Sequence, residues 1–122
     1  MKVLATDFIM IPVSDMAQSL PFYQDVLGLE VTANIEDQWV EFSAPPTTLA
    51  LYQTKGVGRS KGPGTVIGLA VEDVEAAVEE LREANIPIVM EPQHGEWCWT
   101  AVIADPDGNQ VGLHRRNDGT HG

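Results

Sequence analysis

The segment VSDMAQSLPFYQDVLGLEV, residues 13–31, decides the fold, because its opening recurs later in the chain. Val13-Ser14-Asp15-Met16 resembles Val71-Glu72-Asp73-Val74, which lies 58 residues further on. Each copy follows an apolar stretch, residues 8–13 or 66–71, and precedes residues with helical spacing. A repeat at this interval predicts two similar modules.

Each module is predicted to contain one amphipathic helix. Asp15 and Asp73 are of the residue type that caps helix N-termini. Pro21 conflicts with the first helix, since an interior proline costs about 3 kcal/mol, so we expect a kink there or a later start. The apolar residues that recur with a helical period are Met16, Leu20, Tyr23 and Leu27 in the first copy and Val74, Val78 and Leu81 in the second.

Four strands are predicted around each helix. Apolar or alternating stretches cover residues 8–13, 29–35, 38–43 and 47–53, and then 66–71, 86–90, 97–104 and 110–114. We therefore predict a single domain, residues 1–122, of two modules. Its parts are module one (1–53), a glycine-rich linker (54–64), module two (65–116) and a frayed polar tail (117–122).

Composition excludes several classes of function. With 43% hydrophobic and 20% charged residues, the chain is an ordinary globular domain. Its net charge of −11 repels a phosphate backbone, so we expect no nucleic-acid partner. We see neither a membrane span nor a signal peptide, and therefore expect a cytoplasmic protein that does not bind membranes. Cys98 is the single cysteine, which excludes an internal disulfide.

Two motifs resemble a known superfamily. Phe22-Tyr23 followed by Leu27-Gly28-Leu29, and the closing stretch DPDGNQVGL at residues 105–113, are similar to the vicinal oxygen chelate superfamily. This group includes glyoxalases, extradiol dioxygenases and bleomycin-resistance proteins. The resemblance covers residues 8–115 and implies an α+β fold, in which two tandem βαβββ modules form a concave, eight-stranded cup. It also implies a homodimer.

The resemblance places metal ligands on the first and last strands of each module. The corresponding positions hold Phe8 and Ala50 in module one, and Val66 and Gly112 in module two. None of these side chains can bind a divalent ion, which needs imidazole or carboxylate donors. We therefore expect neither a metal nor another cofactor.

Strand alternation predicts which side chains line the cup. The candidate ligand-binding residues are Phe8, Met10, Trp39, Glu41, Tyr52, Trp97, Trp99, Gln110 and His114. The pattern leaves open which face of residues 38–43 and 97–104 is inward. Phe8 and Met10 could equally belong to the core, and Trp97 and Trp99 could pack inside the protein or against a partner chain. His94 is expected in a loop.

The favoured interpretation is a metal-independent binding protein, similar to the bleomycin-resistance branch. It would sequester an aromatic or cationic small molecule and so confer antibiotic resistance. The alternative is a glyoxalase-like lyase or a dioxygenase-like enzyme. Such an enzyme would use Glu41 or His114 as general base, or a metal held by His94, Glu96 and His114. An enzyme is less favoured, because no matched acid–base pair is evident; a regulatory or structural module is a third possibility.

Overall fold

The computed structural model describes residues 2, 4, 7–54 and 66–121. The chain divides into two units, Met1–Gly58 and Arg59–Gly122, which contain module one and module two and are described one at a time. The predicted linker, residues 54–64, lies outside the described residues except for Thr54.

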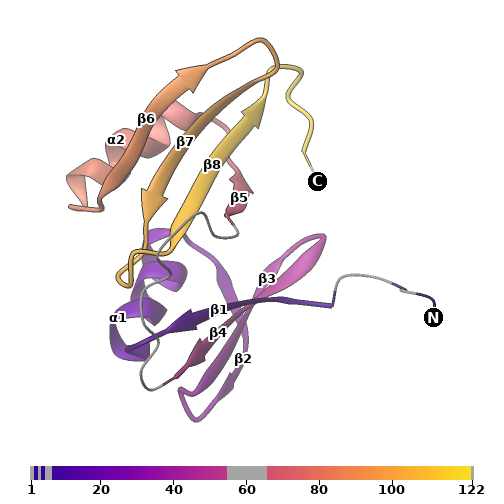
Figure 1. Cartoon of the computed structure of the whole chain (residues 1–122), viewed down its shortest axis with the longest axis vertical. Coiled ribbons are helices and arrows are strands. Elements are labelled where there is room, and N and C mark those ends of the chain that lie inside the picture. Colours follow the sequence, from indigo (N-terminus) through magenta and orange to yellow (C-terminus); the bar gives the residue numbers. More distant parts are fainter. Residues whose placement is uncertain (1, 3, 5–6, 55–65, 122) are drawn as a thin grey trace. The chain divides into compact units, whose positions relative to one another are not determined.

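Module one is a four-stranded mixed sheet with a helical segment on one side (Figure 1). Its elements are β1 (Ile9–Val13), α1 (Met16–Pro21), the π-helical turn η1 (Phe22–Val26), β2 (Glu30–Ile35), β3 (Trp39–Ala44) and β4 (Thr47–Gln53). The strand order is β1-β4-β3-β2. β1 runs parallel to β4, whereas β3 pairs antiparallel with both β2 and β4.

Pro21 changes the type of the first helix and does not delay its start. Asp15 caps α1, since its carboxylate accepts a hydrogen bond from the Ala17 backbone N–H at 3.0 Å. Proline has no N–H to bond the carbonyl four residues back. The chain continues as the π-helical turn, in which the Leu27 N–H donates to the Phe22 carbonyl at 2.9 Å. The expected alternative of a later start is therefore wrong.

Module two repeats this plan with a longer helix (Figure 1). Its elements are β5 (Ile67–Ala70), α2 (Val74–Glu83), β6 (Ile88–His94), β7 (Cys98–Ala104) and β8 (Gln110–Arg116). The strand order β5-β8-β7-β6 matches that of module one, again with the first strand parallel to the last. Asp73 caps α2 through a 3.0 Å hydrogen bond from the Ala76 N–H, as predicted.

Each module buries the face of its sheet that the helix covers. In module one the buried residues of this core are Ile11, Val13, Met16, Phe22, Tyr23, Val40, Phe42, Leu49 and Leu51, and Ala50, on the other face of β4, is fully buried as well. In module two it consists of Val74, Val78, Leu81, Ala101, Ile103, Val111 and Leu113. Because strand residues alternate between faces, the other half of each strand lies on the opposite side, which we call the open face of the module.

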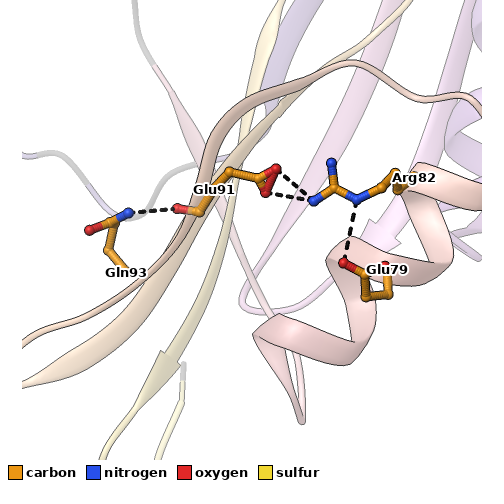
Figure 2. A network of polar contacts seen from close by, with 4 residues as sticks. All are labelled: Glu79, Arg82, Glu91 and Gln93. Atoms are coloured by element: carbon orange, nitrogen blue, oxygen red, sulfur yellow. Dashed lines mark hydrogen bonds and ion pairs between the residues drawn. The ribbon is translucent and has the colours of Figure 1, made fainter.

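An exposed ion pair joins α2 to the edge strand β6 (Figure 2). The Arg82 Nη2 atom lies 2.6 Å from both carboxylate oxygens of Glu91, and its Nε lies 3.4 Å from an oxygen of Glu79. About half of each side chain of the Arg82–Glu91 pair is exposed, so this contact contributes little to the stability of the module.

The predicted α+β fold of two βαβββ modules is confirmed, with one four-stranded mixed sheet in each module. A turn at residues 105–109 connects β7 to β8. The buried Asp105 carboxylate accepts hydrogen bonds from the backbone N–H groups of Asp107 and Asn109 at 2.9 and 2.7 Å. Across the described ranges, no helix is long and apolar enough to cross a membrane.

Candidate functional site

The open face of module one gathers most of the predicted aromatic residues. Strand register places Met10 beside Ala50, Ala50 beside Glu41 and Glu41 beside Ala33, in one row across the sheet. The next row holds Pro12, Tyr52, Trp39 and Ile35. Five predicted ligand-binding residues, Phe8, Met10, Trp39, Glu41 and Tyr52, therefore share this face.

Trp39 is the centre of an aromatic cluster on this face. Its ring meets Phe8 edge-on, with centroids 5.4 Å apart and planes at 89°, and it lies 6.0 Å from the ring of Tyr52. Edge-to-face contact is a favourable arrangement for a pair of aromatic rings. Phe8 and Tyr52 nevertheless keep 47% and 41% of their surface exposed. The rings thus contact one another and remain accessible.

Glu41 places a carboxylate beside these rings. Its neighbours across the sheet, Ala33 and Ala50, are both small, so the half-buried carboxylate is flanked by low side chains. In the part of the chain that the structure describes, this carboxylate has no hydrogen-bond or ion-pair partner. The Thr32 hydroxyl, which lies nearby, donates at 3.3 Å to the backbone carbonyl of Glu41 and not to its carboxylate. An unpaired carboxylate next to aromatic faces suits a cationic group.

The open face of module two is different in character. Gln110 and His114 lie on it together with Gly112, because Val111 and Leu113 point to the buried core. Gly112 pairs with Gly68, so the backbone between β5 and β8 is bare apart from Val66. A Cβ at Gly112 would meet the Val66 Cγ1 at 3.5 Å. At the Gly68–Gly112 pair, this face therefore lacks the large aromatic side chains that module one presents.

Trp97 and Trp99 do not join Gln110 and His114 on that face, which corrects the tryptophan-rich arrangement expected from the sequence. The register Trp99–Arg115 and Ala101–Leu113 puts Trp99 on the side of β7 that α2 covers. Trp97 precedes β7 in a turn and is 77% exposed.

His94 is also placed differently from the expectation. It is the last residue of β6 and not part of a loop, and it pairs with Trp99. The two rings stack with centroids 4.3 Å apart and planes within 4°. The ring Nε2 lies 3.1 Å from the Asn117 side-chain oxygen.

The residues at the expected metal positions do not fit a metal ion. Phe8 and Ala50 share the open face of module one, and Val66 lies against Gly112 in module two, but none of the four offers a donor atom. Among the described residues, no three histidine, cysteine, aspartate or glutamate side chains cluster as a metal site would require. The alternative set His94, Glu96 and His114 is thus not assembled either.

Residues 5–113 match the Glyoxalase/Bleomycin resistance protein/Dioxygenase superfamily, and the chain belongs to this family. The lactoylglutathione lyase of Escherichia coli O157:H7 is 29% identical over 135 aligned residues, which cover 100% of this chain and 98% of that protein. The crystal structure of the Agrobacterium tumefaciens lactoylglutathione lyase is similar with a TM-score of 0.73 at 20% identity, covering 93% and 94% of the two chains.

The fold is shared with an antibiotic-binding protein as well. TnmS3 from Streptomyces sp. CB03234 is similar with a TM-score of 0.74 at 24% identity, covering 96% of this chain and 99% of that one. Lyases and a binding protein thus share this architecture, so the activity has to be argued from the side chains on it.

One residue of the open face of module one was not anticipated from the sequence. Ala33 completes the row that contains Glu41, and its small size keeps the carboxylate accessible. The alternation of residues 30–35 was a usable signal, but a register shift between Val31 and Ala33 obscures it.

Proposed function

We propose that this protein binds a small organic cation or aromatic molecule on the open face of module one, without a metal ion. The observation that carries the proposal is the cluster of Phe8, Trp39 and Tyr52 beside the Glu41 carboxylate, which has no partner among the described residues. Exposed aromatic rings with a few polar groups are typical of small-molecule sites. The fold neighbour TnmS3, an antibiotic binding protein, is consistent with a binding role.

The acidic character of the chain supports a cationic ligand. The net charge of −11 raises the local concentration of cations, and a desolvated cation over an aromatic ring gains about 0.5–2 kcal/mol. Glu41 supplies the matching charge in the same row as Met10 and Ala50. Sequestration of an antibiotic, a homodimeric assembly and a cytoplasmic location belong to the same proposal.

A fluorescence titration tests the proposal. The Trp97→Phe/Trp99→Phe variant leaves Trp39 as the reporter, and phenyltrimethylammonium serves as the probe, with tetramethylammonium and benzoate for comparison. We expect phenyltrimethylammonium to change Trp39 emission at the lowest concentration, because it alone combines a ring with a positive charge. Glu41→Gln should weaken this binding by about tenfold, whereas Ser43→Ala, on the same strand and face, should not.

Three results would contradict the proposal. If benzoate binds as tightly as phenyltrimethylammonium, or if Glu41→Gln has no more effect than Ser43→Ala, the carboxylate does not select the ligand. If no probe changes Trp39 emission at millimolar concentration, there is no binding site for these molecules around Trp39.

The second candidate is a lactoylglutathione lyase activity, which the 29% identical relative favours. It would need acid–base residues or metal ligands outside the positions that the resemblance assigns, since those hold Phe8, Ala50, Val66 and Gly112. A lyase assay of the protein supplied with Zn²⁺ or Ni²⁺ distinguishes the two. Turnover that is lost in Glu41→Gln or His114→Gln would favour the enzyme.

A further inference from the structure

Module two contains a hollow that belongs to neither open face. Its volume is about 250 Å³, below the ~300–1,000 Å³ of pockets that hold drug-sized ligands, so it suits a smaller molecule. It lies where the start of α2 meets β7 and β8, on the helix-covered side of the sheet. Its lining residues are Glu72, Asp73, Val74, Glu75, Trp99 and Arg115.

The lining of the hollow carries charges of both signs, which form no ion pair with each other among the described residues. Arg115 comes from β8. Glu72 lies two residues before α2, and Glu75 is the second residue of that helix. Within the described residues, the ion pairs within 4.0 Å are those of Arg82, so neither carboxylate reaches Arg115. Asp73 is already used, because its carboxylate caps the helix at the Ala76 N–H. The guanidinium and the two glutamates therefore face the same space from different elements.

Trp99 gives this space a rigid aromatic wall. One side of its ring is held by the parallel stack on His94, at 4.3 Å. His94 is itself held by the 3.1 Å contact with Asn117, whose amide group donates to the carbonyls of Gly95 and Glu96. A tryptophan ring fixed in this way loses little conformational freedom when a ligand packs against it.

We infer that this hollow is a second ligand site, for a small zwitterion that carries a substituted ammonium group and a carboxylate. Trp99 and the two glutamates attract the ammonium group, through cation–π contact and charge. Arg115 receives the carboxylate, for which the guanidinium fork is the matching donor. A molecule of this class satisfies both signs of charge at once, which neither a simple cation nor a simple anion does.

The test uses glycine betaine as the probe. In the Trp39→Phe/Trp97→Phe variant of the full chain, Trp99 is the reporter, and the proposed site around Trp39 is altered. We expect betaine to change Trp99 emission with an affinity at least about fivefold better than tetramethylammonium or acetate, a gain of one charge-assisted contact. A response here is independent of binding at module one, so the two proposals fail separately.

Two arginine variants decide the role of the guanidinium. Arg115→Gln should remove the preference for betaine over tetramethylammonium. Arg116→Gln is the matched control, because Arg116 pairs with Cys98 on the opposite face and bonds the Thr120 hydroxyl at 3.2 Å. Equal loss in both variants, or no preference for betaine in the parent, would overturn the inference. Amide chemical shifts of Glu72, Glu75 and Arg115 that do not move on betaine addition would overturn it as well.

Discussion

Replacing Gly112 by alanine should stabilise the protein. The residue lies inside β8, paired with Gly68 on one side and Val102 on the other, and its φ is not in the left-handed region. An added Cβ would lie 3.5 Å from the Val66 Cγ1 and 3.6 Å from the Gly68 Cα, which is ordinary van der Waals contact. The space for a methyl group is therefore already present.

The gain comes mainly from the unfolded chain. Alanine has less backbone freedom to lose than glycine, and a compatible glycine-to-alanine change is worth about 0.4–1 kcal/mol. Gly108, four residues earlier, provides the matched control, because it has a φ of +84°. An alanine there is strained by roughly 1–2 kcal/mol, so the two variants should differ in stability by about 2 kcal/mol.

Urea denaturation followed by circular dichroism measures both variants. With a denaturant slope of ~2 kcal/mol/M, Gly112→Ala should raise the midpoint by about 0.2–0.5 M. Gly108→Ala should lower it. A Gly112→Ala protein that is less stable than the parent would refute the reasoning, since the open face between β5 and β8 would then have no room for a side chain.

Three further predictions follow from the packing and charges. Phe42→Ala should cost about 3–5 kcal/mol in urea unfolding, because the side chain is fully buried and its ring packs against Tyr23 of η1. Glu91→Gln should shift the urea midpoint only slightly at low salt and not at all at 1 M salt, since its pair with Arg82 is half exposed. Hydrogen bonds from Thr120 lower the pKa of Asp118, so the stability that this carboxylate contributes is present above its unfolded pKa and is lost as the pH falls through the folded one. An NMR titration should show this low pKa, and Thr120→Val should raise it.

The fold could be predicted because its signals are local and repeated. Asp15 and Asp73, which occupy the same place in the two repeated segments, both cap helices. The apolar spacing after each aspartate identifies the residues that the helix buries. The effect of Pro21 could not be predicted. A π-helical turn accommodates this proline at the end of a short helix, and no sequence pattern marks such a turn.

The faces of β7 could not be assigned from its sequence. Both alternate sets in residues 97–104 contain apolar side chains, so periodicity does not separate the core face from the open one. Trp99 was predicted to line the cup because aromatic side chains are typical of small-molecule pockets. The smaller Ala101 and Ile103 instead share its face and are buried beneath α2, which only the register with β8 reveals.

His94 was expected in a loop between the strands predicted at residues 86–90 and 97–104, but β6 extends through Pro92 to His94. β6 is an edge strand with register shifts between Ile88 and Met90 and between Met90 and Gln93. An edge strand tolerates proline, because one side of it needs no ladder hydrogen bonds. The strand therefore continues to His94 and brings its ring onto Trp99.

Metal stoichiometry tests the central claim, a metal-independent site, most directly. The untagged full chain would be dialysed in turn against Zn²⁺, Ni²⁺, Mn²⁺ and Fe²⁺ and its metal content measured by mass spectrometry. The account predicts less than about a tenth of an equivalent of each metal per chain, because Phe8, Ala50, Val66 and Gly112 offer no donor atoms. About one tightly held equivalent of any of them would contradict it, and the lyase interpretation would then take first place.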